Sequence, residues 1–319
     1  MERSIVIASP RGFCAGVSHA IEIVELVLER EGAPVYVRHE IVHNRYVVDD
    51  LRAKGAVFVD ELADVPPGAV VIFSAHGVAP SVREEAKARG LRVIDATCPL
   101  VTKVHVETLR YAREQYDILL VGHRGHVEVI GTLGHAPAQM HLVESVEDVA
   151  RVSVRDPERI AVVTQTTLSV DDTRDIVEAI RSRFPAVRLP AKDDICYATQ
   201  NRQTAVKELA RECDRIMVLG STTSSNANRL VEVARNTGTP AVLIEDADAI
   251  DPTWLAGVDT VGVTAGASTP EQLVEESIAR LRGLGFTATR ELSTAVEHVA
   301  FPLPRELRAP APTPGIRPA

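Results

Sequence analysis

The stretch SIVIASPRGFCAGVSHAIEIVELVLE (4–29) passes from a short apolar run into a segment with helical periodicity, and Cys14 stands where the two meet. Two later cysteines stand at the same kind of transition: Cys98 within LRVIDATCPLVTKVHVETLRYA (91–112) and Cys196 within VRLPAKDDICYATQNRQTAVKELA (187–210). We therefore predict that each cysteine lies where an extended segment ends and a helix begins. The partial positive charge at a helix N-terminus favours a thiolate or an anionic cluster there.

The three cysteines belong to a threefold internal repeat. About thirty residues after each cysteine comes a second strand, polar loop and helix, and a third such element follows. The second elements are 34–55, 116–134 and 214–238, and the third elements are 69–90, 160–184 and 260–283. A short strand with an acidic residue near its end separates them (VFVDE, HLVES and VLIED). Each unit thus predicts roughly four strands and three helices, a small α/β layer.

This repeat predicts an α/β fold of three pseudo-threefold-related units, each with a small, mostly parallel sheet. The predicted units are 14–97, 98–193, and 1–13 together with 194–283. The remainder, 284–319, is expected to be a C-terminal extension with a disordered Pro-rich end. Ligands of open α/β sheets bind at the carboxyl edge, so we expect the loops after the strands to face one central cavity.

Composition narrows the class of protein. Of 319 residues, 45% are hydrophobic and only 4% aromatic, which is typical of buried parallel strands covered by helices. Lys and Arg total 35 against 44 Asp and Glu, and this balance argues against general nucleic-acid binding. No segment has the pattern of a signal peptide or a bilayer span, so we expect a cytoplasmic protein without membrane contact. Disulfides are rare in that compartment, which leaves the cysteines available as thiolates; Cys213 is expected to be a small buried thiol.

Three thiolates that converge from three units indicate a metal centre with one metal position left open for chemistry. The wide spacing of Cys14, Cys98 and Cys196 excludes a compact zinc finger and differs from the clustered ferredoxin spacing. Dispersed cysteines at three helix starts favour a [4Fe–4S] cluster in which one iron has no protein ligand. A three-cysteine zinc site and the absence of any metal remain as alternatives.

Small polar residues and histidines follow the strands of all three units. Helix N-termini that carry hydroxyl, amide and imidazole groups commonly bind anions, so these residues predict a phosphate-binding site. Each one taken alone is more often a helix cap or a solvated loop residue, but their recurrence at matching positions favours binding. The candidates are His43, His76, His126, Thr166, Thr167, Ser224, Ser225, Asn226 and Ser268.

Glu128 stands in the first turn of the helix that follows His126. An acid at the positive end of a helix is ordinarily stabilising and needs no further role. Beside an anion site and a metal, its carboxyl group is instead a candidate proton donor for general acid catalysis.

The chain resembles the LytB/IspH family, the 4-hydroxy-3-methylbut-2-enyl diphosphate reductases, from about residue 3 to about residue 285. Nine motifs in the same order carry this resemblance, and together they are far more specific than any one of them. They are PRGFCAGV (10–17), IVHNRYVV (41–48), SAHGV (74–78), DATCPLVTKVH (95–105), GHRGHVEV (122–129), TQTTLSVDDT (164–173), DDICYATQNRQ (193–203), SSNANRL (224–230) and TAGAST (264–269).

The resemblance implies a trefoil of the three units around a [4Fe–4S] cluster held by Cys14, Cys98 and Cys196. It implies reductive dehydration of an allylic diphosphate to isopentenyl and dimethylallyl diphosphate, the last step of the methylerythritol phosphate route to isoprenoids. The histidines, Ser224, Ser225, Asn226 and Ser268 would then bind the diphosphate. Glu128, with Thr166 and His126, would relay protons. A ferredoxin or flavodoxin would supply electrons, since the sequence has no dinucleotide-binding fingerprint.

Two departures from the family pattern stand near the predicted site. The helix after Cys14 has Ser18 and His19 where the resemblance implies a charged residue followed by Arg, and Val127 replaces a common Pro. Two other functions remain open at this point. One is a dehydratase like quinolinate synthase, which also uses a three-cysteine cluster, and the other is a non-catalytic iron–sulfur sensor.

Overall fold

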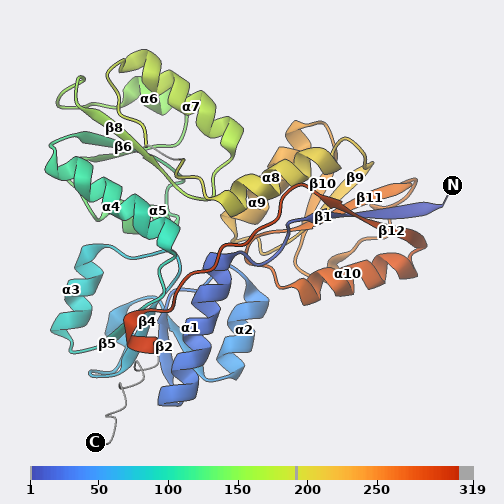
Figure 1. The fold of residues 1–319 in the computed structure, drawn as a ribbon, viewed down its shortest axis with the longest axis horizontal. Helices are drawn as coiled ribbons and strands as arrows, with labels where there is room; N and C mark the ends of the chain where they lie inside the picture. Colours follow the sequence, from blue (N-terminus) through green and yellow to red (C-terminus); the bar gives the residue numbers. More distant parts are fainter. Residues whose placement is uncertain (1, 191–192, 309–319) are drawn as a thin grey trace, which may run out of the picture.

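The computed structural model describes residues 2–190 and 193–308. Three small sheets with helices around them form three lobes that meet at the centre of the molecule (Figure 1). Every strand pairing within these sheets is parallel. The structure thus has the α/β architecture that the repeat predicts. The Pro-rich end, 309–319, for which the sequence predicts disorder, lies outside the described residues.

The first lobe has a four-stranded sheet in the order β3-β2-β4-β5. Its central strand β4 reads VVIF and is buried along its whole length, which requires cover on both faces. The strands are β2 (Val35–Arg38), β3 (Ala56–Val59), β4 (Val70–Phe73) and β5 (Arg92–Asp95), and the helices are α1 (Ala15–Glu31), α2 (Arg45–Ala53) and α3 (Pro80–Ala88), with the 3₁₀ turn η1 (Leu62–Asp64).

The second lobe has three strands in the order β7-β6-β8 rather than the four that the repeat predicts. The segment before Cys196 was expected to be extended, but among its described residues only Arg188 forms a bridge, to Ala161, and none belongs to a strand. Pro190 has no N–H to donate to a ladder, and Asp194 turns inward to accept the backbone N–H of Thr164 at 3.0 Å. The elements are β6 (Asp117–Val121), β7 (Met140–Val143), β8 (Ile160–Thr164), α4 (Pro99–Arg113), α5 (Val127–Leu133), α6 (Val146–Arg151) and α7 (Val170–Arg183).

The third lobe has five strands in the order β10-β9-β11-β1-β12, with β1 from the start of the chain inside the sheet. The edge strand β12 comes from the stretch 284–319, which the repeat predicts to lie outside the three units. The elements are β1 (Arg3–Ser9), β9 (Arg215–Leu219), β10 (Ala241–Ile244), β11 (Thr260–Ala265), β12 (Phe286–Ser293), α8 (Tyr197–Leu209), α9 (Ser225–Asn236), α10 (Glu271–Gly283) and the 3₁₀ turn η2 (Ala247–Ala249).

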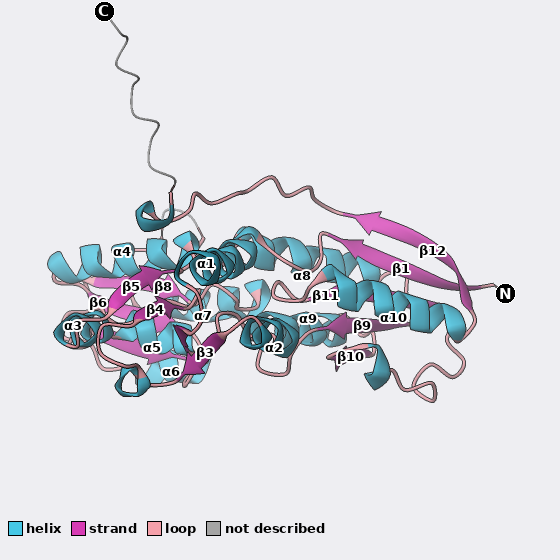
Figure 2. Cartoon of the chain, turned by 90° about the horizontal axis from the view of Figure 1, so that it is seen from below, coloured by secondary structure: helices cyan, strands magenta, loops and turns pink. Residues whose placement is uncertain are grey.

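After β12 the chain leaves the third lobe and crosses the molecule to the first lobe, as Figures 1 and 2 both show. We call residues 294–308 the C-terminal strap; it ends in the 3₁₀ turn η3 (Arg305–Leu307). Leu307 is buried in the apolar core of the first lobe, and Leu303 packs against the same core. Within the described residues, no helix is long and apolar enough to cross a membrane.

Candidate active site

Loops from all three lobes line one central cavity. Apart from the segment before Cys196, each loop follows the carboxyl end of a strand, which is the edge where α/β sheets bind ligands. Every site residue predicted from the sequence lines this cavity. These residues are Cys14, His43, His76, Cys98, His126, Glu128, Thr166, Thr167, Cys196, Ser224, Ser225, Asn226 and Ser268.

The three cysteines cap three helices, as their position in the sequence predicts. Cys14 is the N-cap of α1, Cys98 of α4 and Cys196 of α8. Their backbone N–H groups also connect the three lobes. Each cysteine donates a hydrogen bond to a backbone carbonyl in a cavity loop of a neighbouring lobe. Cys14 donates to Ala267 at 3.1 Å, Cys98 to Ala75 at 3.0 Å, and Cys196 to Thr166 at 3.0 Å. The same kind of bond thus recurs at all three cysteines, as the pseudo-threefold repeat predicts.

The space between the thiols depends on Gly16. A Cβ atom at this position would lie 2.7 Å from the Sγ of Cys98 and 3.8 Å from the Sγ of Cys14, so a larger residue would crowd the sulfurs. Burial, with repulsion from the other two thiols, raises the pKa of Cys98 to about 12. Burial likewise raises the pKa of Cys196 to about 11. Thiolates therefore persist in this cavity only beside a compensating positive charge, which a metal centre supplies.

Three converging thiols are the donor set that iron–sulfur clusters use. Within the part of the chain that the structure describes, no three His, Cys, Asp or Glu side chains form a group that could hold a single metal ion. A cuboidal cluster places each thiolate on a different iron, so its ligands need not gather around one point. The donor chemistry and the space beside Gly16 thus fit a polynuclear cluster.

Three histidines gather on one side of the cavity. The ring centroids of His43 and His76 are 4.2 Å apart, and the His126 ring lies 5.4 Å from His43 and 6.0 Å from His76. Burial, followed by mutual repulsion, holds the pKa of His76 well below its usual value and lowers the pKa of His126 to about 4. His76 and His126 are therefore neutral near pH 7 in the free protein.

One buried nitrogen of this cluster, the Nε2 of His43, has no hydrogen-bond partner. The Nδ1 of His43 lies 3.0 Å from the Oε2 of Glu40, whereas its Nε2 is buried without a hydrogen bond. The Nδ1 of His76 lies 3.2 Å from the Oγ of Ser74, and the Nδ1 of His126 accepts the backbone N–H of Glu128 at 3.1 Å. An unpartnered buried nitrogen is costly unless a ligand satisfies it, so His43 Nε2 is available to bind one.

Glu128 is almost fully buried on the second lobe's side of the cavity. Its Oε1 accepts the backbone N–H of Thr166 at 2.7 Å, and its Oε2 lies 3.0 Å from the Thr166 hydroxyl. Burial raises the pKa of Glu128 to about 7, although the bonds from Thr166 offset part of that effect. A carboxyl group that titrates near neutrality is suited to general acid catalysis.

The third lobe contributes hydroxyl and amide groups at the start of α9. Ser224 caps this helix by accepting the N–H of Ala227 at 3.3 Å, and the hydroxyl of Ser225 lies 3.0 Å from that of Thr167. Asn226 accepts the N–H of Ala267 at 2.8 Å through its Oδ1. The Ser268 hydroxyl donates to the carbonyl of His43 at 2.9 Å, which ties this loop to the histidine cluster.

Two supporting residues of the cavity were not predicted from the sequence. Thr199 links Cys196 to Asn226, since its hydroxyl lies 3.1 Å from the Cys196 Sγ and accepts the Asn226 side-chain amide at 3.3 Å. Gln165 lies within hydrogen-bond distance of Thr167 and Ser225, at 3.0 and 3.4 Å. Gln165 adjoins Thr166 and Thr199 stands three positions after Cys196, so their proximity in sequence to proposed residues was the available signal.

The two departures from the family pattern have different surroundings. His19 is buried, but its ring faces Phe301 of the C-terminal strap, with the centroids 6.2 Å apart, and it does not line the cavity. Val127 is the first residue of α5, directly between the cap His126 and Glu128. Glu128 keeps its bonds to Thr166 with Val127 in place. Cys213 is buried in the core of the third lobe, as expected.

Comparisons with known proteins agree with this geometry. The sequence model of the LytB protein family matches residues 5–282. The chain is 60% identical to a 4-hydroxy-3-methylbut-2-enyl diphosphate reductase of Bordetella pertussis, over 96% of this chain and 94% of that protein. The solved reductase of Plasmodium falciparum superposes with a TM-score of 0.94 at 42% identity, over 96% of this chain and 97% of that one.

A second solved structure superposes less closely. It is described as (E)-4-hydroxy-3-methyl-but-2-enyl diphosphate reductase, the terminal enzyme of the non-mevalonate pathway. Its TM-score is 0.64 at 36% identity, over 88% of this chain and 99% of that one.

Proposed function

Since this chain belongs to the LytB family and is a 4-hydroxy-3-methylbut-2-enyl diphosphate reductase, we propose that its central cavity holds the cluster, the diphosphate and the proton donor of that reaction. The enzyme reduces its substrate, with loss of water, to isopentenyl and dimethylallyl diphosphate, the terminal step of the non-mevalonate pathway. The observation that carries the proposal is the meeting of three thiols, three histidines and a buried carboxyl group in one cavity. The quinolinate synthase-like and sensor alternatives gain no support from the comparisons.

The family implies an iron–sulfur cluster. We propose a [4Fe–4S] cluster with Cys14, Cys98 and Cys196 as its three ligands and one iron left open. When bound, this cluster would supply the electrons and a Lewis-acidic iron. The chain's own contribution is to aim three helix N-termini at the cluster, where their dipoles stabilise its negative charge.

The diphosphate would bind between the histidine cluster and the start of α9. Ser224, Ser225 and Asn226 stand at a helix N-terminus, where backbone N–H groups and the helix dipole attract anions. His43 offers its unpartnered Nε2, and His76, His126, Thr167 and Ser268 complete the walls. An arriving dianionic group would favour protonation of the histidines that burial keeps neutral in the free protein.

Proton delivery falls to Glu128. Its carboxyl group has a pKa raised to about 7, so a large fraction is protonated near neutral pH, and Thr166 fixes both of its oxygens within the cavity. The proton would pass from a Glu128 oxygen toward the substrate hydroxyl as that hydroxyl leaves as water. His126, which is hydrogen-bonded to the N–H of Glu128, would orient this first turn of α5.

Electrons would come from a ferredoxin or flavodoxin in the cytoplasm, and the substrate would be the small-molecule allylic diphosphate. The test is anaerobic. The reconstituted protein is given the substrate and a strong one-electron reductant, and the five-carbon diphosphates are measured. Formation of both products by the wild type, and loss of cluster in Cys14→Ser, Cys98→Ser and Cys196→Ser, is the expected result. A loaded cluster without substrate consumption would overturn the proposal.

A further inference from the structure

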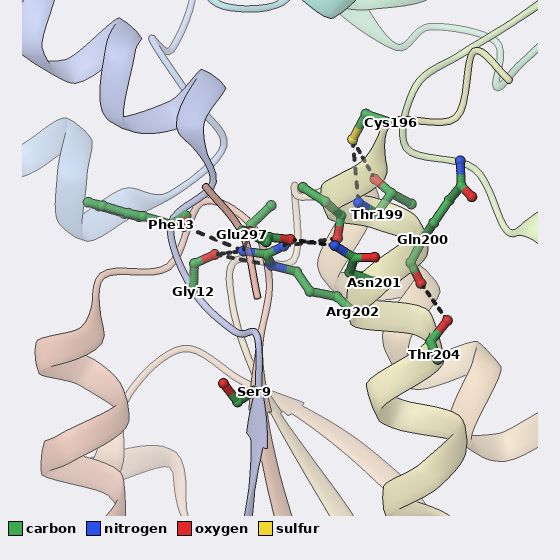
Figure 3. Close-up of polar contacts among 12 residues, drawn as sticks. Ser9, Gly12, Phe13, Cys196, Thr199, Gln200, Asn201, Arg202, Thr204 and Glu297 are labelled. Carbon is green, nitrogen blue, oxygen red and sulfur yellow. Dashed lines mark hydrogen bonds and ion pairs between the residues drawn. The ribbon is translucent and has the colours of Figure 1, made fainter. Parts of the chain in front are cut away.

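Arg202 is fully buried in α8, the helix that Cys196 caps. Figure 3 shows its guanidinium reaching from α8 to the backbone just before Cys14. The Nε and Nη2 atoms donate to the carbonyl of Gly12 at 3.2 and 2.8 Å, and Nη2 also approaches the carbonyl of Phe13 at 3.4 Å. One side chain therefore joins the segments that present two of the three thiols.

The same guanidinium is fixed to its own helix. Its Nη1 donates to the carbonyl of Ala198, in the first turn after Cys196, at 2.9 Å. A guanidinium is a rigid, planar fork of donors, so bonds from its different nitrogens set the relative position of the groups that they contact. Arg202 thus holds the turn before Cys14 at a set distance from the turn after Cys196.

The charge of Arg202 is compensated from a remote part of the chain. Glu297 of the C-terminal strap accepts from Nη1 at 3.0 Å and from Nη2 at 3.3 Å, and it also accepts from the side chain of Asn201 at 3.0 Å (Figure 3). A buried charge without a partner is strongly destabilising, so Arg202 needs this carboxylate in order to remain where it is.

The strap that carries Glu297 is anchored on both sides. At its start, Thr294 donates its N–H and its hydroxyl to the carbonyl of Ser9, at 2.8 and 3.2 Å. At its end, Arg30 of α1 donates to the carbonyl of Leu307 at 2.7 Å, and Leu307 is buried in the core of the first lobe. The strap therefore spans from the third lobe to the first and presents Glu297 between them.

We propose that Arg202, paired with Glu297, is a positioning residue that sets the separation of the Cys14 and Cys196 thiols and thereby the retention and electronic state of the cluster. This inference rests on the proposed function, in which both cysteines ligate that cluster. Residues that orient metal ligands without touching the metal commonly change metal affinity about 10- to 100-fold when altered. A purely structural ion pair would change overall stability without changing the spectrum of the cluster.

The test uses Glu297→Gln and Arg202→Lys in the full chain, reconstituted without oxygen. Glu297→Gln removes the compensating charge, and Arg202→Lys keeps a charge but loses the planar fork. The matched controls are Glu208→Gln and Arg211→Lys, which alter an ion pair of 2.6 Å between the last turn of α8 and the residues just beyond it. Iron release to a ferrous chelator, the electron paramagnetic resonance spectrum of the reduced cluster and its midpoint potential are measured for each.

We expect iron release to become about 10- to 100-fold faster in both test variants, with a changed resonance spectrum and potential, and wild-type behaviour in both controls. Folded test variants with unchanged release, spectrum and potential would overturn the inference. If Arg202→Lys does not fold, the milder Glu297→Gln decides the question alone. A wild type that takes up no cluster would instead overturn the proposed function, and the inference with it.

Discussion

Glu128 and the histidine cluster face the same cavity, yet burial acts on their pKa values in opposite directions. The pKa of Glu128 rises to about 7, whereas that of His126 falls to about 4 and that of His76 falls well below its usual value. Burial disfavours the charged form in each case, so just below pH 7 the free cavity holds a protonated Glu128 beside neutral His76 and His126. The difference separates two tasks. Glu128 can donate a proton, and the histidine cluster can bind the negatively charged diphosphate.

Removing the proton donor should have the largest effect. Glu128→Gln keeps the shape and the bond from the Thr166 N–H but has no acidic proton, so we expect turnover to fall by about 10²- to 10⁴-fold. Iron and sulfide content should stay at the wild-type level, because Glu128 is not a proposed ligand. Glu147→Gln, on an exposed turn of α6, is the control. Wild-type turnover in Glu128→Gln would remove this residue from the proton path.

A change in the histidine cluster should affect diphosphate binding more than the rate of the chemical step. His43→Phe fills a similar space but lacks Nε2, the nitrogen that is unpartnered in the free protein. We expect KM for the diphosphate to rise by about 10- to 100-fold, the value of a hydrogen bond to a charged group, with a smaller change in kcat. Steady-state kinetics of this variant beside His298→Phe, an exposed site on the strap, measure the effect. A fall in kcat with unchanged KM would contradict the assignment.

The pH dependence of activity should come from Glu128. Because the pKa of Glu128 is raised to about 7, its proton is present below that pH and is lost as the pH rises through it. We expect kcat/KM of the wild type, which reports groups of the free enzyme, to fall about tenfold per pH unit above that value. The decline should be absent in Glu128→Gln, whose residual activity has no carboxyl group to titrate. If activity falls in the same way above about pH 7 in both proteins, the decline belongs to a group other than Glu128.

The smallest effect is expected at Val127. It is the first residue of α5, where proline is well tolerated, and its predecessor His126 has the extended backbone that a following proline requires. We expect Val127→Pro to raise the free energy of unfolding by about 0.4–1 kcal/mol, with little change in kcat. Thermal or denaturant unfolding measures this, and Val127→Ala controls for the lost side chain. A large change in kcat would show that Val127 does alter the pose of Glu128.

The cavity was predictable because its residues follow a local rule. Polar residues after strands and before helices identify the carboxyl edge of a sheet, so His43, Glu128 and Ser225 could be placed there from short segments alone. The cysteines at helix starts follow from the same rule. The roles of these residues as cluster ligands, diphosphate-binding residues and proton donor are proposals with the tests given for each.

Features that depend on distant pairing were not predictable. The edge strand β12 joins β1 across almost the whole chain, and no local pattern distinguishes it from an extension. Glu297 meets Arg202 across 95 positions, and an Arg in a helix ordinarily indicates a solvated face. The described residues before Cys196 do not form the expected strand, and this depends on the inward bond of Asp194 to Thr164 as well as on Pro190.

The central claim is that burial keeps Glu128 protonated in the free cavity. Infrared difference spectroscopy of the wild type against Glu128→Gln, recorded over a pH series, tests it most directly through the stretching band of a protonated carboxyl group. The account predicts a band that is specific to the wild type and disappears as the pH rises through about 7. A band that titrates near the ordinary value of 4.5, or no such band just below neutral pH, would contradict it.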